Sequence, residues 1–445
     1  MFAVRTANRI DLCDSNDRLP IRFKTVLLVN LRFPWRASLF GFAPLFERHF
    51  YSMIRLRPTR VLHILGSLNR GGAETWLLHA LRQIDRSEVA MDFLVHQSEP
   101  GVYEDEVRAL GSQIHRCLNP QRMWQYGRHL KKLLTEHGPY DAVHSHVHFY
   151  SGNTLRIARQ CGVPMRIAHS HNDTSHFDNQ AGFVRKAYLR LMSHWIAKHA
   201  THGLAASGKA AVSLFGENWQ VDPRYRILFC GVDLQPFEQA LDLNEVRAEF
   251  GWTDQNFIIG HVGRFDEQKN HPFLLQIFAE IALQRPEARL LLVGIGDRQP
   301  EIKALAAQLG LVDRVAFAGT RADVPRLMLG GMDAFLLPSL FEGLPLVLVE
   351  AQAAGLPCFV SDVIAPETTL VEPLMHHLSL QTSPVSWAET MLAKHPDFSR
   401  NRAHELVAQS PLNIENSARD LQQLYLSAAT RDLVVRKQEL ALSHE

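Results

Sequence analysis

Two glutamates eight residues apart, Glu342 and Glu350, carry the clearest chemical signal in this sequence. An apolar run over 334–337 precedes them and predicts a buried strand, and Pro345 suits the first residue of a helix. We therefore expect Glu342 on a strand-to-helix loop and Glu350 about one and a half turns into the helix. Free N–H groups at a helix start favour an anion. The pair thus fits a sugar nucleotide, with its hydroxyls on the acids and its diphosphate on the amides.

The residues around this pair strengthen the interpretation. Gly343 lets the main chain approach a ligand closely. Open parallel sheets bind ligands at the carboxyl ends of their strands, which is where this loop is expected. On spacing alone, however, two glutamates eight residues apart are more often solvated side chains of a helix.

A second polar group follows another apolar run, 257–262, which also predicts a strand. Arg264 and Lys269 stand on the loop before a helix expected at Pro272, beside a turn at Gly263. When a nucleoside diphosphate leaves a sugar, negative charge grows on the leaving oxygen. A guanidinium fork and an ammonium group can stabilise that charge. The alternative is a surface Arg and Lys without a role.

Six histidines form a third group. Three alternate at strand spacing and three follow later in the chain: His144, His146, His148, His169, His171 and His176. Alternate residues share one face of a strand, so a zinc or iron hydrolase is a distinct hypothesis. No matching carboxylate cluster accompanies these histidines, and the second half of the chain has its own nucleotide-binding pattern.

Composition sets the broad class. A chain of 445 residues with 46% apolar residues predicts about two or three domains with full cores. The net charge of +1 gives no general attraction to nucleic acid. No apolar run reaches membrane-spanning length. The cysteines are odd in number and scattered, which predicts reduced thiols in a cytoplasmic protein: Cys13, Cys117, Cys161, Cys230 and Cys358.

Residues 1–58 differ from the rest of the chain. The stretch 17–60 carries nine Lys or Arg against two Asp or Glu, with aromatic residues between them. Such a segment suits a peripheral anchor on anionic lipid at the inner face of a membrane. We favour instead a poorly ordered N-terminal extension, or an upstream translation start with Met53 as the natural one.

From residue 60 onward, apolar runs alternate with helical patterns. Strands are predicted at 61–65, 91–95, 114–118, 142–146, 166–169, 203–206 and 226–229, and again at 257–262, 290–293, 315–318, 334–337 and 358–360. This alternation predicts an α/β protein with two tandem Rossmann-like, doubly wound parallel sheets that face a cleft. The predicted domains are 59–236 and 237–410, joined by a linker at 233–237, with closing helices and a tail over 411–445.

These features together resemble a known family, the retaining glycosyltransferases of family 4, which have the GT-B fold. The resemblance covers roughly residues 60–430 and rests on motifs in the family's order. They are Gly71-Gly72-Ala73-Glu74, Ala168-His169-Ser170-His171-Asn172, Gly231-Val232-Asp233, Gly263-Arg264-Phe265 with Lys269-Asn270, Val293-Gly294-Ile295-Gly296, and the Glu342/Glu350 pair. The sequence of residues 166–172 is similar to the corresponding segment of exopolysaccharide-synthesis members of the family. The family usually carries Asn where this chain has Cys230.

The resemblance implies a role for each matched residue. It implies catalytic roles for His169, Glu342, Arg264 and Lys269, and donor contacts from Gly72, Gly263, Gly294, Gly343, Leu344 and Glu350. Glu350 would bind the ribose and Glu342 the sugar hydroxyls. The partners implied are a UDP- or GDP-sugar and a glycan or lipid-linked acceptor. The sequence has no Asp-x-Asp motif, so we expect neither a metal nor another cofactor.

Two further functions stay open at this point. A nucleotide-sugar epimerase can share the architecture without using an acceptor. A non-catalytic subunit that binds sugar nucleotides is the other. The intact Glu342, Glu350, Arg264 and Lys269 argue against it but do not exclude it. Product analysis with and without acceptor separates both from a transferase.

Overall fold

The computed structural model describes residues 57–117, 120–175, 178, 181–238, 243–393 and 398–427. The predicted N-terminal extension therefore lies outside the described residues, except for 57 and 58. Among the described residues, no helix combines the length and apolar character that a membrane crossing requires.

The first sheet has seven parallel strands in the order β3-β2-β1-β4-β5-β6-β7. They are β1 (Thr59–Leu65), β2 (Val89–Val95), β3 (Ile114–Arg116), β4 (Ala142–Ser145), β5 (Met165–Ser170), β6 (His202–Ala205) and β7 (Tyr225–Ile227). The strand order reverses between β1 and β4. The loops after these two strands therefore diverge and leave room for side chains or ligands at the carboxyl edge.

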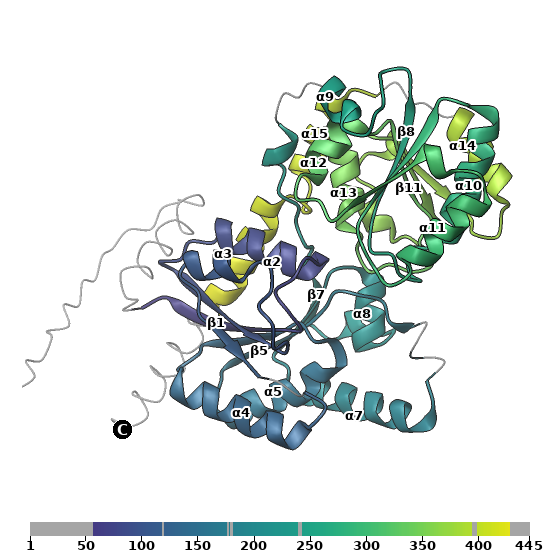
Figure 1. Cartoon of the computed structure of the whole chain (residues 1–445). Helices are drawn as coiled ribbons and strands as arrows, with labels where there is room; N and C mark the ends of the chain where they lie inside the picture. The colour runs from purple at the N-terminus through teal and green to yellow at the C-terminus, as the bar shows by residue number, and fades with distance from the viewer. Residues whose placement is uncertain are drawn as a thin grey trace, which may run out of the picture. The chain divides into compact units, whose positions relative to one another are not determined.

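Helices cover both faces of this sheet. They are α2 (Gly72–Gln83), α3 (Glu104–Ala109), α4 (Met123–Glu136), α5 (Ser151–Gln160), α7 (Phe183–His199) and α8 (Gly208–Phe215), with short 3-10 turns η1 (His148–Tyr150) and η2 (Trp219–Val221). Figure 1 shows α2 and α3 over one face and α4, α5 and α7 over the other. The helical stretch 414–427 joins the α2 side, where Leu421 and Tyr425 are fully buried in the core of the first sheet. This confirms the predicted C-terminal closing helix.

The second sheet has six parallel strands in the order β10-β9-β8-β11-β12-β13. They are β8 (Phe257–Val262), β9 (Ala288–Val293), β10 (Val315–Gly319), β11 (Ala334–Leu337), β12 (Cys358–Ser361) and β13 (Met375–Leu378). Here the order reverses between β8 and β11. These are the strands that precede the Arg264/Lys269 loop and the Glu342 loop.

The second sheet is also covered on both faces. Its helices are α9 (Leu243–Ala248), α10 (His271–Gln284), α11 (Gln299–Gln308), α12 (Val324–Gly331), α13 (Leu346–Ala353), α14 (Pro384–Ala393) and α15 (Arg400–Gln409), with turns η3 (Gln235–Phe237), η4 (Val312–Arg314), η5 (Pro366–Thr368) and η6 (Glu372–Leu374). Figure 1 shows α10, α11 and α14 on one face and α9, α12, α13 and α15 on the other. The two predicted parallel sheets are thus confirmed.

Burial on both faces explains why the strands could be predicted. Leu290, Leu291 and Leu292 are consecutive in β9, and each is fully buried. Parallel strands covered by helices on both sides are continuous apolar runs. The exception is β13, an edge strand with two histidines in its four residues, which the sequence analysis missed.

The segment predicted as a linker is packed. Leu234 and Phe237 are buried in the core of the second sheet. The main chain of Val232 pairs with residues 412–414 through Val232 N–H to Leu412 O at 2.8 Å and Ile414 N–H to Val232 O at 2.9 Å. The exact domain boundaries near residues 236 and 410 stay predictions.

Candidate active site

Glu342 lies on the loop between β11 and α13 and is almost completely buried, with 6% of its side chain exposed. Its Oε1 accepts a hydrogen bond from Lys269 Nζ at 2.6 Å, and its Oε2 accepts one from Gln268 Nε2 at 2.8 Å. Burying a carboxylate is costly unless charge and hydrogen bonds compensate it, and here both oxygens have partners. The structure therefore brings together Glu342 and Lys269, which the sequence analysis placed on separate loops.

The loop after β8 holds Lys269 toward Glu342. Asn270 adopts a left-handed conformation (φ 53°) as the residue before α10, and its Nδ2 donates to Pro338 O at 3.2 Å. Leu340 N–H donates to Gln268 O at 2.8 Å. Asn tolerates this conformation better than most residues. The loops after β8 and β11 are thus joined through their main chains as well as through the buried ion pair.

Two predicted glycines, Gly294 and Gly343, lie where a side chain would not fit. Gly294 has φ +136°, and a Cβ there would overlap the main-chain oxygen of Gly263, so the loops after β8 and β9 touch backbone to backbone. A Cβ at Gly343 would overlap the main-chain oxygen of His171. The Glu342 loop therefore meets the end of β5 at van der Waals distance. Leu344 beside it is partly buried against the apolar cores of both sheets.

A small cavity of about 140 Å³ lies where these segments meet. Its lining comes from the loop after β5 and from the two loops of the second sheet: Asn172, Asp173, Thr174, Gln268, Phe341 and Gly343. Gln268 also holds Glu342, so the cavity adjoins the buried ion pair. The lining residues Asn172, Asp173, Thr174 and Gln268 were not among the predicted site residues, although Asn172 belongs to a predicted motif and the other three stand near one.

Arg264 behaves differently from Lys269. Its side chain is 75% exposed, and its Nη2 lies 3.3 Å from Asp266 Oδ2. The nearby Arg264 charge also acts on Glu74 of α2, whose pKa is nevertheless raised because burial outweighs it. An exposed ion pair at this distance is weak. The guanidinium is therefore able to leave Asp266 for a stronger anion.

Glu350 lies in α13 and is partly buried. Burial raises the pKa of its carboxyl to about 7. None of the hydrogen bonds or ion pairs found among the described residues involves this carboxylate, so its polar atoms are available to a ligand. The helix itself ends as predicted, because Gly355 takes a left-handed conformation (φ +73°) just beyond it.

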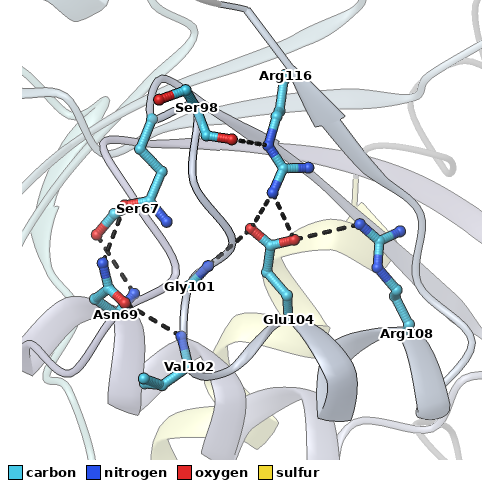
Figure 2. Close-up of polar contacts among 9 residues, drawn as sticks. Ser67, Asn69, Ser98, Gly101, Val102, Glu104, Arg108 and Arg116 are labelled. Atoms are coloured by element: carbon cyan, nitrogen blue, oxygen red, sulfur yellow. Dashed lines mark hydrogen bonds and ion pairs between the residues drawn. The ribbon is translucent and has the colours of Figure 1, made fainter.

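Gly72 is the first residue of α2, and Gly71 is its N-cap. Figure 2 shows how the loop before them is held. Asn69 Nδ2 donates to Gln97 Oε1 at 3.0 Å, and Asn69 Oδ1 accepts from Val102 N–H at 3.2 Å. The loop that contains Gly101 and Val102 is in turn held by a buried carboxylate.

That carboxylate is Glu104, the first residue of α3. It accepts from Arg116 Nη2 at 2.7 and 2.8 Å, from Gly101 N–H at 3.0 Å and from Arg108 Nη2 at 3.3 Å (Figure 2). The sequence analysis missed both Asn69 and Glu104. The contacts of Asn69 with Gln97 and of Glu104 with Arg116 depend on the side-by-side pairing of β1, β2 and β3.

His169 is the last residue but one of β5 and is fully buried, so its predicted role at the transferred sugar stays a prediction. It lies in a cluster with three other predicted histidines and with one that the sequence analysis missed: His63, His144, His146, His169 and His171. Two trios in this cluster, which share His146, have ring nitrogens within 4.8 Å of one another. His63 comes from β1, in register with His144 of β4.

The other two histidines of the predicted metal pattern do not join this cluster. His148 lies in the turn η1, with a left-handed main chain (φ 48°), and belongs to neither trio. His176 lies outside the described residues. The cluster has no carboxylate ligand within either trio. It is thus a histidine-only arrangement, without the carboxylate ligand that zinc proteases add to their histidines.

Two family models match the chain in consecutive blocks. "Glycosyl transferase 4-like domain" matches residues 71–231, and "Glycosyl transferases group 1" matches residues 242–375. The first block contains the His169 strand and the Gly71-Gly72 loop. The second contains the ion pair of Lys269 and Glu342, together with Glu350.

Similar proteins carry related names. The chain is 39% identical over 340 residues to a Bacillus subtilis protein named as the glycosyltransferase EpsF, covering 75% of this chain and 86% of the relative. It is 31% identical over 244 residues to an Escherichia coli UDP-Gal:alpha-D-GlcNAc-diphosphoundecaprenol alpha-1,3-galactosyltransferase, covering 53% of this chain and 60% of the relative. It is 25% identical over 375 residues to the capsular polysaccharide biosynthesis glycosyltransferase CapH of Staphylococcus aureus, covering 83% and 99%.

Solved structures share the fold at lower identity. HepE of Anabaena, in complex with UDP and glucose, superposes with a TM-score of 0.67 at 19% identity and covers 82% of this chain and 98% of its own. Sucrose-phosphate synthase of Thermosynechococcus elongatus gives a TM-score of 0.66 at 20% identity, with 85% and 100% covered. The fold is thus GT-B, and with the EpsF similarity the chain belongs to the group 1, family 4-like glycosyltransferases.

Proposed function

We propose that this glycosyltransferase is a retaining enzyme that moves a sugar from a UDP- or GDP-sugar to a polysaccharide or lipid-linked acceptor in the cytoplasm. The observation that carries the proposal is the buried Lys269–Glu342 pair next to the cavity that Asn172 and Gln268 line. It puts a fixed carboxylate and an ammonium group at the carboxyl ends of β8 and β11, where a doubly wound sheet binds its ligand.

Each charged group has a proposed task on the donor. Glu350, whose carboxylate has no described partner, binds the ribose, and Glu342 contacts hydroxyls of the sugar. Arg264 leaves Asp266 to meet the diphosphate, since a guanidinium fork matches phosphate oxygens better than an exposed carboxylate holds it. The free N–H groups at the start of α13 add a second anion site. Lys269 supplies positive charge while it orients Glu342.

The names of the relatives support the acceptor class. The E. coli relative is named for a UDP-sugar donor, a diphosphoundecaprenol acceptor and an α linkage. The S. aureus relative is named for capsular polysaccharide. These names favour a lipid-linked or growing glycan over a small soluble acceptor. The basic segment 17–60 supports a peripheral contact with the inner face of the membrane, where such an acceptor is held.

We further propose that transfer needs no divalent metal. The growing charge on the leaving diphosphate is met by Arg264, Lys269 and the start of α13. Preorganised cations and N–H groups of this kind stabilise charge that develops in a transition state. The sequence also has no Asp-x-Asp motif to hold a metal on the diphosphate.

A product experiment tests the proposal. The full chain is incubated with UDP-glucose, UDP-galactose, UDP-N-acetylglucosamine or GDP-mannose, with and without a polyprenyl-diphosphate-linked sugar. NMR of the product should show that the anomeric configuration of the donor is kept. An inverted product would contradict a retaining mechanism. Conversion of the donor sugar without acceptor would favour the epimerase instead.

A further inference from the structure

Seven buried or partly buried side chains in and around the first sheet form one continuous chain of short polar contacts. One half runs through the closing helix. His169 Nδ1 lies 3.1 Å from His144 Nε2, and His144 Nδ1 lies 2.6 Å from Tyr425 Oη. Tyr425 Oη lies 3.3 Å from His63 Nε2. The phenol of the helical stretch 414–427 thus bridges histidines of β1 and β4.

The other half begins at the same His63. Its Nδ1 lies 3.1 Å from His146 Nε2, and His146 Nδ1 lies 2.8 Å from His171 Nε2. His171 Nδ1 lies 3.6 Å from the Sγ of Cys230. Cys230 is the residue that replaces the family's usual Asn, so the departure from the family pattern stands at one end of this chain of contacts.

The contacts share one polarity. At each histidine-to-histidine link, Nε2 of one ring meets Nδ1 of the next, and Tyr425 is inserted between an Nε2 and an Nδ1. A neutral imidazole has one N–H donor and one bare nitrogen acceptor. Turning the tautomer of a single inner ring would set two N–H groups against each other at one link and two lone pairs at another. Buried polar atoms rarely tolerate such a loss.

The rings are neutral at physiological pH. Burial lowers the pKa of His63 and of His171 to about 3, and it lowers the pKa values of the other three well below the ordinary value. Within the described part of the chain, no carboxylate makes a hydrogen bond to any of the five rings. Each of the seven groups, when neutral, carries one polar hydrogen, which makes seven. Six of these hydrogens are needed for the six hydrogen bonds of the chain.

We propose that these groups form a head-to-tail proton chain that holds all five histidines as the Nε2–H tautomer. In it, Cys230 and Tyr425 are positioning residues that set the tautomer of His169. The seventh proton then lies on His169 Nε2, which has no hydrogen-bond partner among the described residues.

The groups at the two ends of the chain, Cys230 and His169, favour this direction of donation over the reverse. In the proposed direction, Cys230 donates S–H to His171, and the unpaired group is a sulfur lone pair, which costs little to bury. His169 Nε2–H remains as a donor beside Trp76, whose ring is 5.4 Å away and nearly perpendicular at 83°. An N–H can donate to an aromatic face in such an arrangement, and a lone pair cannot. The reverse direction leaves His169 Nε2 as a buried lone pair and Cys230 S–H without a described acceptor.

A consequence for catalysis rests on the proposed function. His169 Nε2 is then held as an N–H donor, the form suited to an oxygen of the donor sugar or its phosphate. Substitutions that remove the O–H of Tyr425 or the S–H of Cys230 should let His169 adopt either tautomer. They change no residue near the nucleotide. Turnover should fall several-fold while the KM for the donor stays the same.

The direct test is long-range ¹H–¹⁵N NMR of the histidine rings in the full chain, with assignments from single substitutions. We expect five neutral Nε2–H rings that do not titrate between pH 6 and 8. Tyr425→Phe keeps the ring but removes the bridge, so the Nδ1 signal of His144 should shift to that of a nitrogen without a donor. Tyr140→Phe is the matched control: Tyr140 is also buried, but its hydroxyl donates to Asp92, and the histidine signals should not move.

Cys230 gives a second pair of variants. Cys230→Ala should change the Nδ1 signal of His171, and Cys230→Ser, which restores a donor hydrogen, should return it. A single Nδ1–H or doubly protonated ring among the five would overturn the chain. So would a stoichiometric transition metal in the purified protein, because a metal binds the lone pair of a ring nitrogen, and in the chain every such lone pair already accepts a hydrogen bond. These readouts need no transfer activity, so they can succeed even if the proposed function fails.

Discussion

Lys269 Nζ lies 2.6 Å from Glu342 Oε1, and the two side chains are 13% and 6% exposed. This contact joins the loop after β8 to the loop after β11, the two strands between which the order of the second sheet reverses. An ion pair at this depth fixes loop geometry, because neither partner can turn to water without leaving the other buried charge alone. The candidate active site thus has a rigid half, formed by this pair, and an adjustable half, formed by exposed Arg264.

Removing one partner of the buried pair should destabilise the protein. Lys269→Met leaves the carboxylate of Glu342 without its cation, and we expect a loss of about 3–5 kcal/mol in the free energy of unfolding. The double variant Lys269→Met with Glu342→Gln should recover a large part of that loss. Urea denaturation measures both.

Arg298→Met is the matched control. Arg298 pairs with Glu301 one helical turn away, but both side chains are substantially exposed, at 35% and 55%. Its loss should cost less than about 1 kcal/mol. If Lys269→Met costs no more than this control, the ion pair does not hold the two loops.

Glu350 should make stability depend on pH. Its folded pKa of about 7 lies above the ordinary value of 4.5, so the folded state binds the proton more tightly than the unfolded state. The resulting stabilisation is complete below about pH 4.5 and is lost as pH rises through 7. Glu350→Gln cannot lose a proton, so its stability relative to the parent should rise over this window, by at most about 3 kcal/mol.

Chemical denaturation at pH 5, 6, 7 and 8 measures this difference. Glu405→Gln provides the comparison, since Glu405 is an exposed glutamate in α15 that pairs with Arg402 at the surface. Its stability relative to the parent should show no such rise. A pH-independent difference between Glu350→Gln and the parent would mean that the carboxyl is solvated and ionised throughout.

Gly343 should tolerate no side chain. Gly343→Ala would force a Cβ against the main-chain oxygen of His171, and we expect a loss of about 1–3 kcal/mol together with weaker donor binding. Gly66→Ala is a suitable control because a Cβ there meets nothing within 4 Å. Thermal unfolding of the two variants beside the parent gives the comparison, and equal stability of both would show that the loops are not in contact.

Transfer should persist in excess chelator. The proposed cations on the diphosphate are Arg264 and Lys269, which a chelator does not remove. Initial rates with and without EDTA, after removal of bound metal, measure this. Abolition by EDTA and recovery with one added metal would contradict the proposal and direct attention to the histidine cluster.

The sequence predicted the fold well because its strands are buried on both faces and are therefore plain apolar runs, as β9 illustrates. It failed at β13, where an edge position permits His376 and His377 in place of an apolar run. Helix bounds were also predictable where a local residue sets them, as with Pro272 at the start of α10 and Gly355 beyond α13.

The site was predicted residue by residue but not as a geometry. Lys269 and Glu342 were each expected near the donor, yet their mutual contact depends on β8 and β11 being neighbours in the sheet, which no local pattern records. His63 was missed for the same reason, because a single histidine in β1 becomes notable only in register with His144. The contacts of Asn69 with Gln97 and of Glu104 with Arg116 likewise exist only because of the order of the strands.

Donor affinity measured beside turnover tests the proposed site most directly. Titration calorimetry with the nucleotide sugar, and steady-state rates with acceptor, would be run on the parent, Glu350→Ala, Glu342→Ala and Arg264→Ala. Glu350→Ala should weaken donor binding roughly ten- to hundredfold, as expected for a lost charge-assisted hydrogen bond. Glu342→Ala and Arg264→Ala should mainly lower turnover, because their contacts strengthen as the sugar leaves the diphosphate. If all three variants bind the donor and turn over like the parent, the loops after β8 and β11 are not the active site.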